Sequence, residues 1–343
     1  MMLRLTAAAS VLLGVFLGAA QAAQPDPGTR IDAIVQHWMN DFHIENAEVA
    51  IASHGKLLSS FGHGWKATDK QPLGSLSKLV TGLCVASLMD QGKLHVDETL
   101  GKVLGNSIMM PKDPRFATIT IGQLLMHRAG LVKNAFDDEH DHNIEEAFAS
   151  ATQAPLDNNP GTAVAYSDSG YLMLGYVIQH VANARYEDAC AHVFTDAGLP
   201  KNAGVIDPTL AARAPNGGWD IDAVDYAELL SVLDPKTGKL GKISAAWLQG
   251  LSDEKAVAQG PCPRFQPEAS YGFGFCRQVT PAGVRFYHDG LLHFHPPFYK
   301  KTGGSFFYVN EAGVAAVVIF SGENKGDAYH ALETEIINAM LTQ

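Results

Sequence analysis

Patterns typical of β-strands occur near both ends of this 343-residue chain, with a long helical stretch between them. Near the start, residues 47–53 and 56–61 read as two strands joined by the turn His54-Gly55. The other strand candidates are 272–279, 284–288, 305–310 and 314–321. Because a strand needs a partner, strands this far apart in the chain predict one sheet that is built from both chain ends.

The middle of the chain has helical apolar spacing instead. Residues 74–91 read as a long apolar helix. The other helix candidates are 30–43, 120–127, 144–151, 171–181, 226–233 and 327–341. We therefore expect an α/β (α+β) fold, in which an antiparallel sheet formed from both chain ends is flanked by helices and an all-helical lobe is inserted. A functional site is expected in the cleft between the lobes.

The first 23 residues have the layout of a signal peptide. Arg4 supplies the positive charge, an apolar run follows over residues 5–17, and small residues lead to a cleavage site near Ala22 or Ala23. No later stretch approaches the roughly 20 apolar residues that span a bilayer. The sequence predicts a periplasmic or secreted protein without a membrane span.

Residues 24–343 are expected to form a single domain. Its α/β lobe would comprise about 24–80 and 215–343, and its helical lobe about 81–214. The formal net charge is -11, and the basic residues are scattered. This charge argues against nucleic acid or anionic membranes as partners and favours a small-molecule or peptide substrate. The oligomeric state is not determined by these features.

The four cysteines form no CxxC pair, so neither a zinc site nor a thioredoxin-like motif is supported. Cys262 and Cys276 either form a short disulfide or stay unpaired. Cys84 lies in the apolar helix candidate, where a buried, unreactive thiol is expected. The fourth cysteine is Cys190.

The strongest local motif is Ser75-Leu76-Ser77-Lys78, at the start of the long helix candidate. A three-residue spacing puts the serine and the lysine on one helical face, so the ammonium can reach the hydroxyl. The serine also lies near the positive end of the helix dipole, which favours an alkoxide. By itself the motif is common by chance and more often marks a helix cap and a surface lysine than a catalytic pair.

Two later segments complete a pattern: residues 160–171, which contain Tyr166-Ser167-Asp168, and Tyr287-His288-Asp289-Gly290. Together with Ser75 and Lys78 they resemble the serine β-lactamase and penicillin-binding-protein superfamily, in the branch of class C β-lactamases, DD-peptidases and family VIII esterases. The resemblance covers nearly the whole mature chain. Its supporting segments are residues 117–131, 215–230 and 271–275.

The resemblance implies roles for three residues. Ser75 would be the nucleophile and Lys78 its activator. Tyr166 would act as a general base in its phenolate form, or relay a proton, and later protonate the leaving group. A phenol with a pKa near 10 needs an adjacent cation to act as a base near neutral pH, and we expect Lys78 to supply one. The resemblance implies no cofactor.

The superfamily's third motif, Lys-Thr-Gly or His-x-Gly, has three candidates here. Residues 236–238 lie in a turn between helices and are set aside. His288 lies seventeen residues after Tyr271, whereas Lys301 lies thirty after it. Because relatives separate these motifs by under about twenty residues, we favour His288-Asp289-Gly290 and treat Lys301 as a candidate substrate contact.

In that role His288 would hydrogen-bond near Tyr166 and to the carboxylate or carbonyl of the substrate. The backbone N–H of Leu291, paired with that of Ser75, would form an oxyanion hole. Asp289 and Gly290 would lie on the substrate side of the same strand. The family's Tyr-x-Asn is Tyr166-Ser167-Asp168 here.

Asp168 is therefore a departure from the family pattern. An ionised aspartate only accepts hydrogen bonds, and it would hold Lys78 more firmly protonated. This favours ester or otherwise unusual substrates over the amide side chains of β-lactams and peptides. Esterase, β-lactamase and DD-carboxypeptidase activities share the motifs, so the motifs do not separate them.

Two other functions have some support in the sequence. Residues 137–142 and 293–295 are rich in metal-ligand types but show no recognisable ligand spacing, so no metal is predicted. A non-catalytic descendant would use the same cleft to bind a cell-wall fragment or a protein. The sequence favours an exported serine hydrolase that forms an acyl-enzyme on Ser75 and cleaves an ester or amide.

Overall fold

The computed structural model describes residues 26–107, 111–137, 140–234, 262, 269–292, 302–322 and 326–341. The expected signal peptide, the set-aside segment 236–238, Lys301 and the segment 293–295 lie outside the described residues. Within the described residues, no helix is long and apolar enough to cross a membrane.

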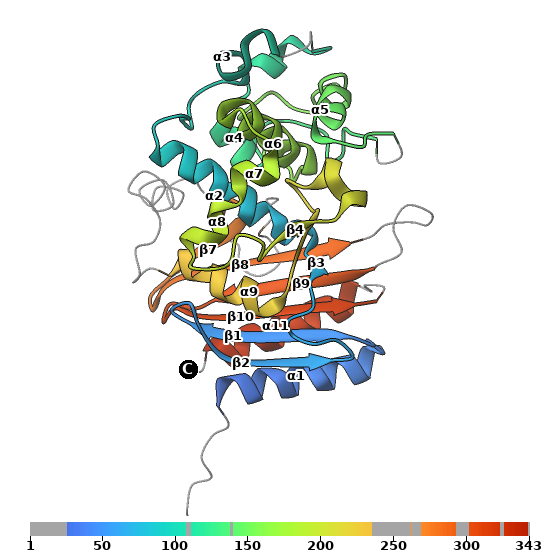
Figure 1. Ribbon diagram of the computed structural model, residues 1–343, viewed down its shortest axis with the longest axis vertical. Helices are drawn as coiled ribbons and strands as arrows, with labels where there is room; N and C mark the ends of the chain where they lie inside the picture. Colours follow the sequence, from blue (N-terminus) through green and yellow to red (C-terminus); the bar gives the residue numbers. More distant parts are fainter. Residues whose placement is uncertain are drawn as a thin grey trace, which may run out of the picture.

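A seven-stranded antiparallel sheet joins the two ends of the chain, which confirms the predicted fold class (Figure 1). Its order is β2-β1-β10-β9-β8-β7-β6, and Val49 on the first hairpin lies opposite Val318 near the chain end. Apolar side chains bury both faces of the central strands. The strands are β1 (Ala47–Ser53), β2 (Lys56–His63), β6 (Ser270–Gly272), β7 (Phe275–Thr280), β8 (Gly283–Leu292), β9 (Gly303–Val309) and β10 (Val314–Ser321).

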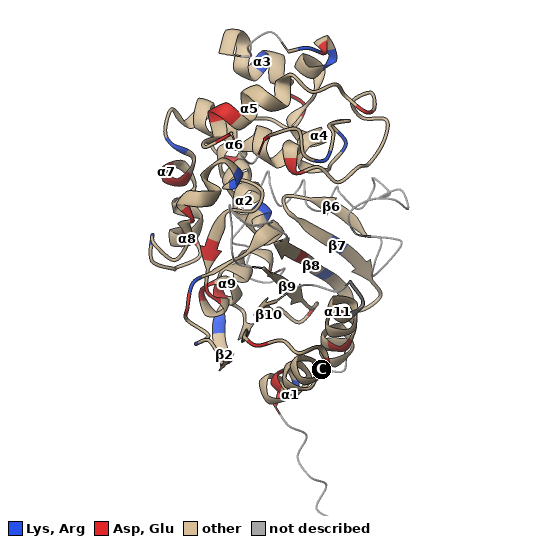
Figure 2. Cartoon of the chain, turned by 90° about the vertical axis from the view of Figure 1, so that its right-hand side faces the viewer, with Lys and Arg blue, Asp and Glu red and all other residues tan. Residues whose placement is uncertain are grey.

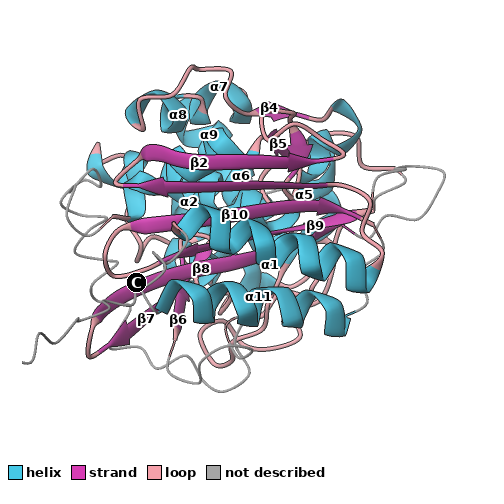
Figure 3. Ribbon diagram, turned by 90° about the horizontal axis from the view of Figure 1, so that it is seen from below, coloured by secondary structure: helices cyan, strands magenta, loops and turns pink. Residues whose placement is uncertain are grey.

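Helices α1 (Pro27–Phe42) and α11 (Gly326–Leu341) lie side by side over one face of this sheet (Figure 3). Trp38 fixes them together, since its indole N–H donates to the Ala328 carbonyl at 2.6 Å. Its ring also meets Phe320 edge-on, with centroids 4.8 Å apart. The carboxylate of Asp26 caps the start of α1 by accepting from the Gly28 N–H at 3.0 Å.

The helical part of the chain lies on the other side of the sheet (Figure 1). Helix α2 is apolar on nearly every side and is buried accordingly. A small sheet, β3-β5-β4, lies where the chain passes between the two parts, and the sequence did not predict it. The short strands are β3 (Gln71–Pro72), β4 (Val205–Ile206) and β5 (Trp219–Ile221).

The helices of this part are mostly short. The α-helices are α2 (Ser77–Asp90), α3 (Leu100–Leu104), α4 (Ile121–Leu125), α5 (Ile144–Thr152), α6 (Asp168–Ala182), α7 (Tyr186–Cys190), α8 (His192–Asp196) and α9 (Ala223–Leu229). The 3-10 turns are η1 (Gly74–Leu76), η2 (Gly105–Ser107), η3 (Pro114–Thr118), η4 (Pro208–Arg213) and η5 (Leu230–Leu233). In Figure 2, Lys and Arg residues are dispersed over the described elements, as their scatter in the sequence predicts.

Two disulfides cross-link the chain. Cys262 and Cys276 pair, which resolves the alternative that the sequence left open. Cys84 pairs with Cys190 and joins α2 to α7, so the expectation of an unreactive thiol was wrong. The partners are 106 positions apart, and only the packing of the two helices brings their Cα atoms to 5.2 Å. Closing a loop of that size is worth about 4.7 kcal/mol in the chain-entropy model.

Candidate active site

Ser75 lies in the 3-10 turn η1, directly before α2, rather than in the α-helix expected from its sequence. Gly74 precedes it with a φ of +54°, a conformation that favours glycine. A Cβ atom on Gly74 would lie 3.1 Å from the backbone nitrogen of Leu291. The turn therefore brings Ser75 close to strand β8, and a side chain at position 74 would separate them.

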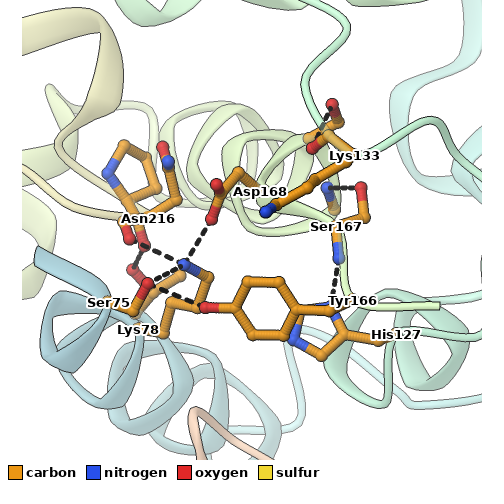
Figure 4. Close-up of polar contacts among 12 residues, drawn as sticks. Ser75, Lys78, His127, Lys133, Tyr166, Ser167, Asp168 and Asn216 are labelled. Atoms are coloured by element: carbon orange, nitrogen blue, oxygen red, sulfur yellow. Dashed lines mark hydrogen bonds and ion pairs between the residues drawn. The ribbon is translucent and has the colours of Figure 1, made fainter. Parts of the chain in front are cut away.

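Lys78 is fully buried in the first turn of α2, and its Nζ faces three acceptors (Figure 4). It donates to Ser75 Oγ at 3.0 Å, to Asp168 Oδ1 at 2.6 Å and to the Asn216 carbonyl at 2.8 Å. An ammonium carries three protons, so each proton has an acceptor here. Burial lowers the pKa of Lys78, and the adjacent Asp168 carboxylate opposes that shift.

Tyr166 reaches Ser75 from the helical part, with its Oη 2.8 Å from Ser75 Oγ. It directly precedes Ser167, whose hydroxyl caps α6 by accepting from the Gly170 N–H at 3.3 Å. Burial raises the pKa of Tyr166 well above 10, and the Asp168 charge acts in the same direction. Desolvation of the phenolate dominates this shift in the resting site, which favours the expected proton relay over the expected phenolate base.

Asp168 is the first residue of α6 and forms an ion pair with Lys78. Its second oxygen, Oδ2, accepts from the Asn134 side chain at 3.1 Å when that amide is oriented to satisfy its neighbours. The carboxylate side chain is only 15% exposed. Asp168 is therefore engaged by Lys78 and Asn134, and it is not a donor toward a substrate.

Strand β8 carries His288 beside these groups but not bonded to them. The His288 ring centroid lies 6.4 Å from that of Tyr166, and its Nε2 lies 3.1 Å from the Tyr271 hydroxyl. The expected hydrogen bond near Tyr166 is thus made with Tyr271 in this structure. Burial lowers the pKa of His288 to about 4, so the imidazole is neutral at neutral pH.

The end of β8 passes directly beside the serine turn. A Cβ atom on Gly290 would lie 2.3 Å from the Leu73 carbonyl oxygen and 3.1 Å from the Ser75 nitrogen. Gly290 therefore faces Ser75, and its lack of a side chain permits the approach. Because neighbouring strand residues face opposite sides, the Asp289 side chain lies on the other side of the sheet from Gly290, contrary to its expected place near the substrate.

A pocket of about 430 Å³ opens at the strand ends of the sheet, beside the end of β8 and the start of β9. Leu292, Trp65 and Gln71 are among its lining residues, and none of the candidate catalytic residues is. Within the described residues, no group of three His, Cys, Asp or Glu side chains could hold a metal ion. Residues 138–139 of the acidic segment lie outside that description.

The sequence did not single out three residues that the structure places around this site: His127, Asn134 and Asn216. His127 packs against Tyr166, Asn134 contacts Asp168, and Asn216 binds Lys78 through its backbone carbonyl. His127 and Asn216 lie within segments that support the family resemblance. Asn134 lies in a loop without any motif, so nothing in the sequence marked it.

Comparisons with known proteins identify a family and several relatives. A family model described as Beta-lactamase matches residues 31–339. Protein flp of Staphylococcus aureus (strain MW2) is 28% identical over 174 residues, which cover 47% of this chain and 35% of that protein. The Teichoic acid D-alanine hydrolase of Staphylococcus aureus is 28% identical over 167 residues, which cover 45% of this chain and 39% of that protein.

Solved structures extend the likeness to most of the chain. The octameric penicillin-binding protein homologue from Pyrococcus abyssi superimposes with a TM-score of 0.71 at 18% identity. The superposition covers 93% of this chain and 78% of that one. At this identity the likeness shows the fold alone, whereas the sequence matches span little more than a third of the two Staphylococcus aureus proteins.

Proposed function

The chain belongs to the beta-lactamase family, and we propose that it is an exported serine hydrolase that forms an acyl-enzyme on Ser75. Members of this family are serine hydrolases. The proposal depends chiefly on one observation: Ser75 Oγ lies 3.0 Å from Lys78 Nζ and 2.8 Å from Tyr166 Oη. A hydroxyl held between a lysine and a tyrosine has a cation to stabilise its alkoxide and a second group to move its proton.

Proton accounting favours a relay through Tyr166 over a resting phenolate. Burial and the Asp168 charge keep the phenol protonated, and Lys78 has all three ammonium protons committed. As Ser75 Oγ attacks the substrate carbonyl, Tyr166 accepts the serine proton and passes its own proton to the leaving group. The serine loses one proton, the leaving group gains one, and Tyr166 is unchanged. Lys78 stabilises the charge that develops on Ser75 Oγ.

The backbone N–H groups of Ser75 and Leu291 are proposed as the oxyanion hole. Both lie at the contact between η1 and β8, where Gly74 and Gly290 allow the two backbones to approach. Two preorganised amides in such a hole contribute a few kcal/mol to transition-state stabilisation. Water then repeats the sequence on the acyl-enzyme and releases the acid.

We favour an ester substrate, with an amide as the alternative, because Asp168 replaces the family's asparagine. Its oxygens accept from Lys78 and Asn134, so no amide is present there to bind a substrate carbonyl. The similarity to the protein named Teichoic acid D-alanine hydrolase supports the proposal that this chain is a hydrolase acting on cell-envelope material. The alternative function is β-lactamase or DD-carboxypeptidase activity. In either case the proposed substrate is a small molecule or peptide.

Export is proposed from two observations. The signal-peptide pattern over residues 1–23 predicts translocation. The disulfides Cys84–Cys190 and Cys262–Cys276 are of the kind that persist in oxidising compartments.

The decisive experiment labels the purified protein with a fluorophosphonate and locates the adduct by peptide mass spectrometry. We expect an adduct on Ser75 in the wild type and none in Ser75→Ala. Hydrolysis of p-nitrophenyl esters should fall by at least about 10³-fold in that variant. Ester, nitrocefin and D-Ala-D-Ala peptide substrates tested in parallel rank the activities. A folded wild type that neither labels nor hydrolyses any of them would contradict the proposal and favour a binding protein.

A further inference from the structure

His127 contacts the chain on both sides of Tyr166, and Figure 4 shows its contact with Ser167. Its carbonyl oxygen accepts from the Ala165 N–H at 2.9 Å. Its imidazole Nδ1 accepts from the Ser167 N–H at 3.1 Å. One residue therefore anchors the backbone immediately before and immediately after the tyrosine whose hydroxyl contacts Ser75.

The imidazole also packs against the Tyr166 side chain. The two ring centroids are 4.4 Å apart, and the His127 ring lies 4.5 Å from Tyr271 on strand β6. Tyr271 in turn is hydrogen-bonded to His288 on β8. His127 thus contacts Tyr166 and a residue of the sheet at once, so it limits how far the phenol can swing from Ser75.

Two further features indicate which properties of His127 matter. Its backbone φ is +55°, which a residue other than glycine adopts only where its surroundings demand it. The buried Nε2 has no hydrogen-bond partner among the described residues. The parts of His127 that contact its surroundings are therefore the Nδ1 acceptor, the ring and the backbone in its left-handed conformation. Nε2 contributes no hydrogen bond among the described residues.

We propose that His127 is a positioning residue for the reaction, which holds Tyr166 Oη against Ser75 Oγ through its neutral Nδ1 acceptor and its ring. This inference depends on the proposed function, because it concerns the same serine. Burial, with a further contribution from the Lys78 charge, lowers the pKa of His127 well below 6.5. The imidazole therefore stays neutral at neutral pH, as an acceptor at Nδ1 requires.

The test compares two substitutions. In His127→Phe the ring remains but the acceptor is lost. In His127→Asn the side-chain oxygen takes over the acceptor position near the Ser167 N–H, and asparagine tolerates a positive φ. We expect His127→Phe to lower kcat on a p-nitrophenyl ester, and the rate of fluorophosphonate labelling, by about 100-fold, as misplacement of a catalytic group does. KM should change by less than about threefold, and His127→Asn should recover most of the lost rate.

His192→Phe is the matched control. This histidine also has a buried Nε2 without a partner among the described residues, and its Nδ1 is hydrogen-bonded to the nearby Ala189 carbonyl. It lies in α8 and touches none of the groups around Ser75, so labelling should match the wild type. If His127→Phe does not fold, His127→Gln replaces it, because its longer side chain does not present an acceptor at the Nδ1 position.

Each outcome separates the two proposals. Folded His127→Phe or His127→Gln protein that labels as fast as the wild type would overturn the positioning role and leave the serine hydrolase intact. Equal loss in His127→Asn and the acceptor-free variant would overturn the acceptor as its basis. A wild type that does not label on Ser75 would overturn the proposed function and the role of His127 with it.

Discussion

The two sides of Ser75 are built differently. From the helical side, Lys78 and Tyr166 direct side-chain groups at its hydroxyl, and Asp168 pairs with the lysine. From the sheet side, β8 approaches with backbone, and its one ionisable side chain on that face, His288, contacts Tyr271 instead. In the proposed mechanism, proton transfer and charge therefore come from the helical side, while the strand supplies amide donors.

The difference also affects tolerance to substitution. The helical side depends on which side chains are present, because Lys78, Tyr166 and Asp168 each bind specific partners there. The β8 side depends on the absence of side chains at Gly290 and on backbone that any residue supplies. Apart from substitutions at Gly290, changes should therefore cost much more activity on the helical side, and the following experiments test that ranking.

The largest effect is expected for Lys78→Met. Ser75 loses the cation that stabilises its alkoxide, so fluorophosphonate labelling should fall by at least about 10³-fold. Loss of one partner from a buried pair also costs about 3–5 kcal/mol of stability. The double variant Lys78→Met/Asp168→Asn removes the unpaired charge and serves as the control. It should regain thermal stability without regaining activity, and recovered activity would show that the lysine is dispensable.

A smaller effect, about tenfold, is expected for Asp168→Asn. Removal of this charge lowers the pKa of Tyr166 and removes the ion pair that holds Lys78. The new amide can donate to a substrate carbonyl. Hydrolysis of nitrocefin should rise and ester cleavage should fall, measured as kcat/KM on both substrates. The alkaline limb of the pH–rate profile should move to lower pH. The opposite change in substrate preference would disprove the link between Asp168 and ester specificity.

A still smaller effect is expected for His288→Gln, whose kcat should stay within about fivefold of the wild type. The imidazole is bonded to Tyr271 and not to Ser75 or Tyr166, so glutamine removes packing rather than a proton carrier. Gly290→Ala is the contrasting variant, because its methyl group would collide with the Leu73 carbonyl. A 100-fold loss in His288→Gln would place its side chain in the reaction.

The smallest effect concerns acid stability. The pKa of His288 is about 4 in the folded protein, against an ordinary value of 6.5. Between these values the unfolded chain binds a proton that the native state does not, so stability falls as the pH drops from about 6.5 to about 4. The fall in Tm over that range should be a few degrees smaller in His288→Gln. Burial raises the pKa of Glu48 to about 8, which acts oppositely, so the difference between the two proteins is the quantity to compare. An identical pH profile would contradict a buried, neutral His288.

Much of the fold followed from local patterns. The first hairpin, β9, β10 and α11 each lie within two residues of their expected ranges, because apolar periodicity is a local property that burial then enforces. Strand β8 runs further than expected, to Leu292, since glycine and aspartate within it weaken the strand signal. The small sheet β3-β5-β4 was missed because its strands have only two or three residues each.

The candidate site divides in the same way. Ser75 and Lys78 are three positions apart, so the backbone alone places them near each other. Asn134 and the Asn216 carbonyl contact the site from loops remote in sequence, and the Cys84–Cys190 disulfide depends on the packing of α2 against α7. No local pattern encodes such contacts.

The sequence by itself determined the family resemblance, the strand and helix order and the motif residues, since these depend on residue type and short spacings. Only the tertiary structure decided how those residues are ionised and with whom they pair. Tyr166 is a half-buried phenol with a raised pKa, Asp168 binds Lys78 and Asn134, and His288 faces Tyr271. Ionisation and pairing depend on desolvation and on hydrogen-bond partners. Both are set by groups that meet only when the helical part of the chain packs against the sheet.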